Sequence, residues 1–394
     1  MKVGVPEVHA VPSDKELLER ARSAIPTLAA RAEQTERRLR PDPDSIAAVR
    51  QAGLFALTVP RHAGGFEASL RGQVGVLAQL GAACTSTAWV TALSGTVKNM
   101  FAPVLPEEAR SALFADPNAI VCGHTVPVGV SGERTEYGLR ISGRWRLAAG
   151  CEDASWAVLV VPVFGDGLPG APRPVLVSVK DLTVERTGRT AGLAGTGSHT
   201  LVAHDVVVPL THVASCSTAA DTETASPTDL TALLGTAVAL LAALIGAARG
   251  AQLTVGTILA DDKAARSMAR KGLIDSPRVW HWYFNATHLI DTALYRALFV
   301  ADLLDDLPDG EPLPAQQRAQ AQTELISAAQ ECREAVENLL DLHGTSGFNN
   351  DNPLQRFWRD VSVGTRHPHF SPYTTAEDYL DVLLGAQAPL ASML

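Results

Sequence analysis

The sequence predicts an α+β protein in which an N-terminal α-helical domain, a middle antiparallel β-barrel domain and a C-terminal four-helix bundle follow one another. Helical periodicity dominates the first third of the chain, short β-rich runs fill the middle, and the helical period then returns. The 394 residues suit two or three domains of ordinary size. We expect three domains and one linker, at 1–118, 119–215, 216–229 (the linker) and 230–394.

The N-terminal domain is predicted from helix start and stop signals. Ser13 and Glu16 have the spacing of a capping box, and an amphipathic run follows to about Leu39. Further helices are expected near 46–52, 70–83, 87–101 and from Glu107 onward.

The middle domain is predicted from β-rich runs separated by Gly and Pro turns, such as SWAVLVVPVF and HTLVAHDVVVPL. Runs of this length and spacing are typical of a small antiparallel barrel or sandwich. The small polar residues of 215–229 indicate a linker.

The C-terminal domain is predicted as an up-and-down bundle with helices near 230–267, 277–305, 315–343 and 373–386. Residues 230–248 carry no charge over the length of a membrane span. They are rich in Ala, Gly and Thr, however, and we interpret them as a helix buried at the centre of the bundle.

Composition excludes several classes of function. The 42 acidic and 33 basic residues give a net charge of −9, which argues against a nucleic-acid partner. The five cysteines are far apart and form no CxxC pair, which favours reduced thiols in a cytoplasmic protein. The N-terminus has no apolar signal core, so we expect neither secretion nor a membrane partner.

Ordered motifs along the whole chain resemble one superfamily. They are AGLFALTVP at 52–60, STAWV at 86–90, FAPVLPEEA at 101–109, SGRW at 142–145, GLAGTGS at 192–198, DVVVP at 205–209 and PLQRFWRD at 353–360. Together they resemble the acyl-CoA dehydrogenase-fold flavoproteins. The resemblance implies the fold described above, a bound flavin, and a homotetramer formed through the C-terminal bundle.

The position of the catalytic base separates two chemistries within that superfamily. Many of the dehydrogenases have a Glu eight residues after the Asp of the ArgAsp motif, but here Pro368 stands eight residues after Asp360. Proline cannot accept a proton, so the dehydrogenase base is missing there. The sequence resembles instead the flavin-dependent monooxygenases of this fold, many of which have a His seven residues after that Asp. His367 holds this position, and an imidazole titrates near neutral pH, as acid/base catalysis requires.

Two other interpretations of this segment were weighed. His367 and His369 are a weak zinc motif without a third ligand nearby, and we predict no metal. The charges of Arg356, Arg359 and Asp360 have the spacing of ion pairs on a helix face.

The resemblance also implies cofactor contacts. The GLAGTGS loop precedes a strand and not a helix, so it is not a dinucleotide fingerprint. A plain tight turn is the alternative to flavin contacts from this loop. The resemblance places the flavin ring against Trp145, whose indole would stack on it and exclude water. The other expected cofactor contacts are Thr125, Ala149, Gly150, Thr196, Gly197, Ser198 and Arg266, the last through the phosphate of a neighbouring subunit's flavin.

Two departures from the family concern reactivity. Related monooxygenases often have SerGly where this chain has Ala149 and Gly150, so a hydroxyl near flavin N5 is absent. Several relatives also have a His seven or eight residues after the Trp of AlaTrpVal, where this chain has the stretch Thr96-Val97-Lys98-Asn99, with Lys98 or Asn99 as candidate replacements. His124 is the second candidate catalytic residue, and the expected substrate contacts are Trp89, Asn99 and Phe101.

The resemblance implies the oxygenase component of a two-component flavin-dependent monooxygenase. Reduced flavin (FMNH2 or FADH2) would come from a separate NAD(P)H:flavin reductase and activate O2 as a C4a-hydroperoxide. A small organic substrate would then be hydroxylated or N-oxygenated, with bacterial natural-product biosynthesis as the expected setting. The alternatives are an FAD-dependent acyl-CoA dehydrogenase or oxidase, and a non-catalytic member of the fold.

Overall fold

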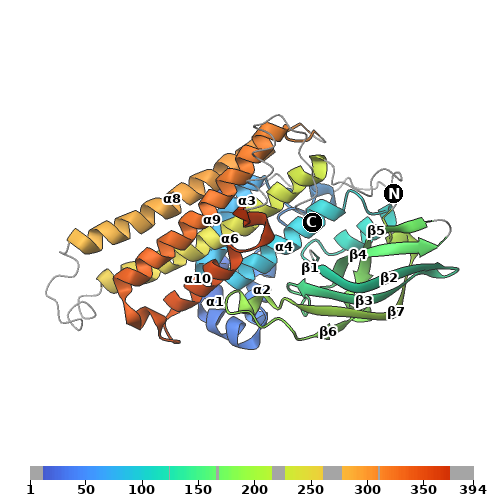
Figure 1. The fold of residues 1–394 in the computed structure, drawn as a ribbon, viewed down its shortest axis with the longest axis horizontal. Coiled ribbons are helices and arrows are strands. Elements are labelled where there is room, and N and C mark those ends of the chain that lie inside the picture. The colour runs from blue at the N-terminus through green and yellow to red at the C-terminus, as the bar shows by residue number, and fades with distance from the viewer. Residues whose placement is uncertain are drawn as a thin grey trace, which may run out of the picture.

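The computed structural model describes residues 12–123, 125–165, 168–214, 227–260, 277–308 and 311–372. A curled β-sheet lies at one end of the molecule and a bundle of long helices at the other, with helix α4 between them (Figure 1). The order of helical, β and helical regions confirms the predicted fold class. The exact domain boundaries stay a prediction.

The N-terminal region forms the helices that the sequence pattern predicts. They are α1 (Asp14–Arg38), α2 (Pro43–Gln51), α3 (Leu70–Ala83), α4 (Thr85–Phe101) and α5 (Glu107–Phe114). The capping box at the start of α1 is present, because Ser13 and Glu16 each hydrogen-bond the other's backbone N–H. Helix α1 ends at Leu39, which adopts a left-handed conformation with φ 56°.

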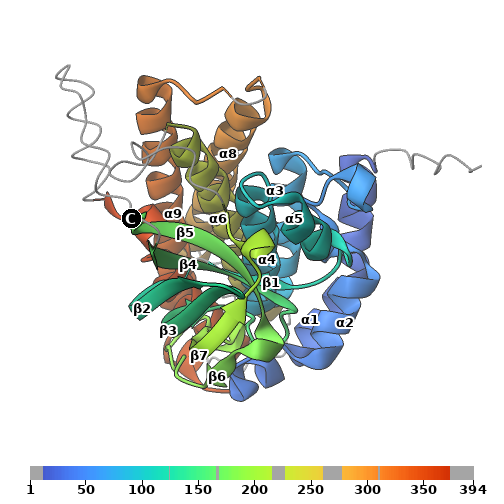
Figure 2. The same ribbon diagram turned by 90° about the vertical axis from the view of Figure 1, so that its right-hand side faces the viewer.

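The middle region is one seven-stranded sheet in the order β1-β4-β2-β3-β7-β6, with β5 paired to β4. The strands are β1 (Val121–Cys122), β2 (Val126–Thr135), β3 (Gly138–Ala148), β4 (Trp156–Gly165), β5 (Leu168–Ser178), β6 (Thr183–Glu185) and β7 (His199–Val208). Most pairs are antiparallel, as expected, but β4 pairs in parallel with both β1 and β2. Figure 2 shows the sheet curling around its own core, while α1 and α2 lie to one side.

The C-terminal region contains α6 (Pro227–Ala260), α8 (Pro277–Asp305), α9 (Ala315–His343) and α10 (Pro353–Gly364). Helix α10 was not among the four predicted bundle helices, although Asn352 caps it and Pro353 occupies its first turn. The helix predicted at 373–386 lies outside the described residues, as does most of the predicted linker.

Helix α6 is the centre of the bundle. It is long and apolar enough to cross a membrane, but 78% of its most apolar window is buried inside the protein. Glycines allow α3 to approach it closely: a Cβ on Gly81 would lie 2.3 Å from the Ala243 carbonyl oxygen, and one on Gly246 the same distance from Ala78. The apolar sequence of α6 therefore reflects burial among neighbouring helices, as predicted.

Candidate active site

His367 stands just beyond the end of α10, and three aromatic rings surround it. The indole of Trp89, on α4, meets the imidazole edge to face with ring centroids 5.8 Å apart. The rings of His369 and Phe370 lie 4.8 and 6.5 Å away. Trp89 and Phe370 are buried while His367 is half-buried. The imidazole is therefore held in a fixed direction and still has access to solvent.

The hydrogen bond at Nδ1 defines the tautomer of the neutral His367 ring. The backbone N–H of His369 donates to Nδ1 at 3.4 Å, as residue 367 caps the short 3₁₀ helix η8 (Pro368–Phe370). In the neutral ring this acceptor role leaves the proton on Nε2. In this tautomer the Nε2–H group can donate a hydrogen bond, whereas Nε2 can accept a proton only in the Nδ1–H tautomer, in which the contact from His369 is lost.

The GLAGTGS loop lies directly on α10. A Cβ on Gly192 would lie 1.9 Å from the carbonyl oxygen of Arg359, so only glycine fits at this crossing. The backbone N–H of Leu193 donates to the carboxylate of Asp360 at 2.6 Å. Gly364 packs against Leu193 as well, because its own Cβ would lie 3.3 Å from that side chain. The loop and the helix that carries His367 thus form one packed unit.

The residues after strand β3 join this unit through Gly150. Its backbone N–H donates to the carbonyl oxygen of Thr196 at 2.8 Å, and its φ of 72° suits glycine. A Cβ at Gly150 would lie 2.8 Å from the side chain of Val90, the neighbour of Trp89 on α4. Three segments that are far apart in the sequence therefore meet here: the 149–150 turn, the 192–198 loop and the end of α10.

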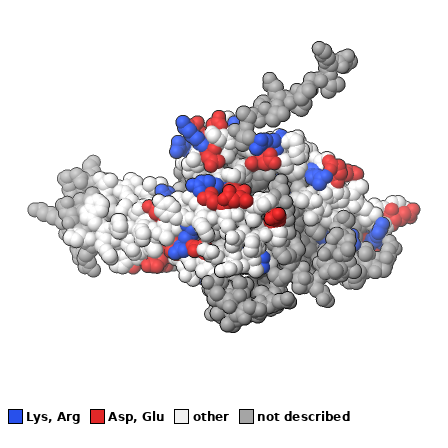
Figure 3. Space-filling model, turned by 90° about the horizontal axis from the view of Figure 1, so that it is seen from above, with Lys and Arg blue, Asp and Glu red and all other residues white. Residues whose placement is uncertain are grey.

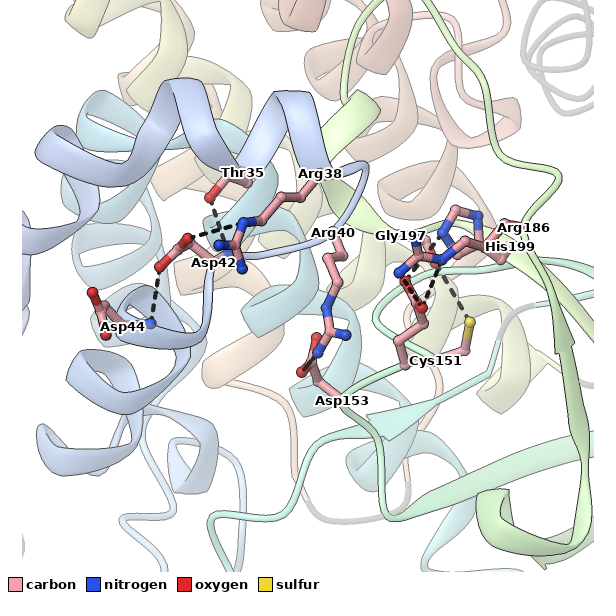
Figure 4. Close-up of polar contacts among 11 residues, drawn as sticks. Thr35, Arg38, Arg40, Asp42, Asp44, Cys151, Asp153, Arg186, Gly197 and His199 are labelled. Atoms are coloured by element: carbon pink, nitrogen blue, oxygen red, sulfur yellow. Dashed lines mark hydrogen bonds and ion pairs between the residues drawn. The ribbon is translucent and has the colours of Figure 1, made fainter.

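Polar contacts brace the 149–150 turn and the 192–198 loop against each other (Figure 4). The thiol of Cys151 donates to the carbonyl oxygen of Gly197, and the buried imidazole of His199 lies 3.3 Å from the carboxylate of Glu152. Arg40, just after α1, pairs with Asp153.

Burial lowers the pKa of His199, and Glu152 opposes this shift. Burial likewise raises the pKa of Asp153, against the effect of Arg40.

The expected stacking of Trp145 on the cofactor requires correction. Its indole is fully buried inside the curled sheet and donates from Nε1 to the carbonyl oxygen of Val160 at 3.0 Å. No ring face is exposed for a ligand. Trp145 faces the core in the same alternation as Leu139 and Ile141, and the register between β3 and β7 shifts only after it, between Trp145 and Ala148.

Leu147 is the residue that the sequence analysis missed at this edge. It lies within the register shift, has φ 63° and remains 50% exposed, two residues before Ala149. Positive φ is unfavourable for a bulky side chain, and such strain concentrates at functional sites. No local sequence signal marks this residue, because the β-bulge depends on pairing with β7.

The other predicted cofactor residues have varied surroundings. Thr196 is buried and donates to the Leu193 carbonyl oxygen at 2.7 Å, whereas Ser198 is half-buried and within 2.8 Å of the Thr196 hydroxyl. Gly197 has φ 61°, and Ala149 is 5% exposed. Thr125 is half-buried at the start of β2. His124 and Arg266 lie outside the described residues.

The three predicted substrate residues do not form one surface. Asn99 and Phe101 lie ten and twelve residues beyond Trp89 on α4, which corresponds to a rise of roughly 15 to 18 Å. Asn99 lines a separate hollow of about 390 Å³ with Thr96 and Thr236. Phe101 packs on an apolar cluster beside β1. Of the three, only Trp89 is placed beside His367.

Lys98 is a structural residue and not a replacement for the histidine found in several relatives. It is 1% exposed, and its ammonium group donates to the carbonyl oxygens of Phe55 and Pro117, each at 2.9 Å. Burial lowers the pKa of Lys98 to about 7, with Asp116 opposing the shift.

The charges on α10 differ from the predicted ion pairs along its face. Arg359 pairs with Glu36 of α1, and Asp360 is buried against Leu193.

Within the described residues, no group of three or more His, Cys, Asp or Glu side chains could hold a metal ion. A polar hollow of about 870 Å³ between α6 and the segment 346–353 contains none of the predicted residues.

Comparisons with known proteins identify the family. The chain matches the model of the acyl-CoA dehydrogenase N-terminal domain over residues 12–111 and that of the C-terminal domain over residues 232–372. It is 30% identical over 366 residues to the flavin-dependent monooxygenase oxygenase subunit HsaA of Rhodococcus jostii (strain RHA1), covering 90% of this chain and 94% of that protein.

Two further similarities concern monooxygenases. The chain is 31% identical over 363 residues to the oxygenase component of the FADH(2)-dependent resorcinol hydroxylase of Rhizobium sp. (strain MTP-10005), covering 85% of this chain and 86% of that protein. It resembles the structure of XiaF from Streptomyces sp. in complex with FADH2 and glycerol, with a TM-score of 0.85, 28% identity, and coverage of 96% and 97%. The chain is thus an enzyme that belongs to the flavin-dependent monooxygenases of the acyl-CoA dehydrogenase superfamily.

Proposed function

We propose that the chain is the oxygenase component of a two-component monooxygenase. It receives FMNH2 or FADH2 from a separate NAD(P)H:flavin reductase, and uses O2 to hydroxylate or N-oxygenate a small organic substrate. The observation that carries this proposal is the position of His367, held against Trp89 where the 149–150 turn and the 192–198 loop meet α10. The relatives are named as an oxygenase subunit and an oxygenase component, which supports a separate reductase.

We assign the cofactor to the edge formed by β3 and the 196–198 segment. Ala148 pairs with His199, which brings the exposed Leu147 and the half-buried Ser198 to the same edge. Leu147 would cover the ring and exclude water, while the Ser198 hydroxyl and neighbouring backbone amides would hydrogen-bond its polar rim. Reduced flavin, when bound, reacts with O2 and supplies the oxygen atom for transfer.

His367 is the proposed acid/base residue. With its Nδ1 accepting the His369 backbone N–H, the Nε2–H group would donate to the substrate's oxygen or nitrogen. Proton uptake at Nε2 from the substrate's hydroxyl or amine would use the Nδ1–H tautomer, in which the His369 contact is released. Trp89 fixes the ring direction and makes the surroundings of that atom apolar. This chain has Ala149 where relatives place a serine, so the other donors on this edge must be backbone amides or Ser198.

Helix α8 supports the proposed homotetramer. Trp280, Phe284, Tyr295 and Phe299 are all exposed, at spacings that place them on one face of the helix. Phe284 and His288 stack with an interplanar angle of 3°. Figure 3, seen from above, shows a largely white surface with few charged side chains on the side of the molecule where the bundle lies. An apolar face of this kind is buried when copies of the chain associate through it.

The experiment that tests the oxygenase function uses isotopic oxygen. The protein is titrated anaerobically with FMNH2 and FADH2, then mixed with ¹⁸O₂ and a panel of phenols and indoles. We expect a product carrying one ¹⁸O atom, formed only when reduced flavin is supplied. Complete conversion of O2 to peroxide with every substrate would contradict the proposal, and bleaching of bound FAD by an acyl-CoA thioester would favour a dehydrogenase.

The setting and the assembly have their own tests. We propose a soluble enzyme of the bacterial cytoplasm acting in natural-product biosynthesis, and deletion of its coding sequence should then abolish one secondary metabolite and leave growth unchanged. Light scattering should report a tetramer. Phe284→Glu combined with Tyr295→Glu should dissociate it, whereas Tyr137→Glu, at an exposed turn of the sheet, should not.

A further inference from the structure

Asp360 is a buried carboxylate that the proposed chemistry does not use. It lies on α10 seven residues before His367 and is 4% exposed. Among the described residues its carboxylate makes no ion pair within 4 Å. The backbone N–H of Leu193 donates a hydrogen bond to this carboxylate at 2.6 Å. A bond of this length to an ionised acceptor is among the stronger hydrogen bonds in proteins.

The surroundings of Asp360 come from three other segments of the chain. Burial raises the pKa of Asp360 to about 6, while the Leu193 amide, Arg356 and Thr85 of α4 oppose this shift and Glu36 of α1 adds to it. A carboxylate in such a place is costly unless a specific contact requires it. For Asp360 the specific contact is the hydrogen bond from the Leu193 amide, in the 192–198 loop.

The backbone on both sides of this hydrogen bond is tightly constrained. The guanidinium of Arg359 donates to the carbonyl oxygen of Ala191, and the backbone of Gly192 touches that of Arg359. Leu193 has φ 53°, which is uncommon for leucine. The carboxylate of Asp360 therefore holds a strained loop flat on α10.

The effect of this contact extends to the proposed flavin edge. Three residues after Leu193, the carbonyl oxygen of Thr196 accepts the backbone N–H of Gly150. Four residues after Asp360, α10 ends at Gly364, whose carbonyl oxygen accepts the backbone N–H of His367. The hydrogen bond between the Leu193 amide and Asp360 thus connects the loop that would contact flavin to the helix that precedes His367.

We propose that Asp360 is a positioning residue: its hydrogen bond to the Leu193 amide sets the 192–198 loop and the 149–150 turn at a fixed distance from His367. The inference rests on the proposed function, since it assigns flavin contact to that loop. Residue 360 acts through the side-chain oxygen that accepts the hydrogen bond from the Leu193 amide. Asparagine can supply that oxygen, whereas alanine and serine cannot reach the amide.

The test compares Asp360→Asn, Asp360→Ala and the milder Asp360→Ser with Leu354→Ala. Leu354 is a fully buried residue on the same helix, so its truncation destabilises α10 without removing the contact to Leu193. Hydrogen–deuterium exchange of residues 190–198 is measured in the flavin-free protein. We expect about 10-fold faster exchange at the Leu193 amide in the alanine and serine variants, and near wild-type exchange in D360N and L354A.

The same variants are then examined with reduced flavin. D360A and D360S should raise the Kd for reduced flavin about 10-fold and divert O2 from product to peroxide, and D360N should restore both quantities. Exchange at Leu193 that is equal in D360A and L354A would overturn the proposal, as would a D360N variant that behaves like D360A. Because exchange needs no flavin, a wild-type protein without oxygenase activity would refute the proposed function and leave the positioning measurement intact.

Discussion

The imidazole of His367 contacts the edge of the Trp89 indole, with ring centroids 5.8 Å apart and an angle of 66° between the ring planes. The two residues are 278 positions apart in the sequence, on α4 and beyond α10. This contact joins helix α4 of the N-terminal region to the segment just beyond α10 in the C-terminal region. Its geometry determines the direction of His367 Nε2.

The effect of a Trp89 substitution on catalysis should depend on whether the new side chain still contacts the His367 ring. Trp89→Phe keeps an aromatic edge and should retain most product formation. Trp89→Ala should lower it about 10- to 100-fold, because the imidazole loses its support, and should destabilise the fold by about 3–5 kcal/mol. Product yield per flavin oxidised and chemical denaturation measure the two effects. An unchanged yield in W89A would show that the indole does not orient His367.

Removal of the proposed acid/base group should affect turnover and not flavin binding. His367→Ala is expected to reduce product formation by about 10² to 10⁴, the range typical of general acid–base catalysis. The Kd for reduced flavin should change less than about threefold. His369→Ala is the matched control, since its ring lies 4.8 Å away and its backbone N–H to Nδ1 is preserved. Equal losses in both variants would argue against the assignment.

Two glycine-to-alanine substitutions should have opposite effects on stability. A Cβ on Gly192 would collide with the backbone of Arg359, so Gly192→Ala should destabilise the protein by about 3 kcal/mol or more. Gly235 lies within α6 and a Cβ there meets nothing within 4 Å, so Gly235→Ala should stabilise it by about 0.5–1 kcal/mol. Denaturant unfolding measures both, and a neutral G192A would contradict the close crossing.

Lys98 should make stability rise with pH above neutrality. Burial lowers the pKa of Lys98 to about 7, below its ordinary value of 10.5, so between these values the unfolded chain binds more protons than the folded one. The free energy of unfolding should therefore gain about 2 kcal/mol between pH 7 and 9 relative to Lys98→Met. The comparison of the two unfolding curves cancels other groups that titrate in this range. Parallel pH curves would show that Lys98 stays charged when folded.

We expect Leu147 to lower the stability of the fold while strengthening the binding of reduced flavin. Leu147→Gly relieves its positive φ and should stabilise the fold by about 1 kcal/mol, while weakening the binding of reduced flavin. Leu39 is a suitable control, because it also has positive φ but ends α1. Leu39→Gly should leave the flavin Kd unchanged. Tighter flavin binding in L147G would remove Leu147 from the proposed cofactor edge.

Signals that act within a few residues were sufficient to predict much of the fold. The capping box of Ser13 and Glu16 and the period of residues 70–83 predicted α1 and α3 closely, because helix formation depends on contacts three and four residues apart. The central position of α6 followed from its lack of charge. The family resemblance added His367, whose proposed role depends on spacing from Asp360.

The remainder depends on contacts between distant segments, and for these the sequence carries no local pattern. The exposure of Leu147 results from a register shift against β7, because a one-residue shift reverses the direction of a side chain. Asn99 and Phe101 share α4 with Trp89, but the helix rise carries them away from His367. The sequence alone thus determined the order of elements and the chemistry available. Packing between residues as distant as Leu193 and Asp360 decided which groups meet, because those contacts exist only once the chain has folded.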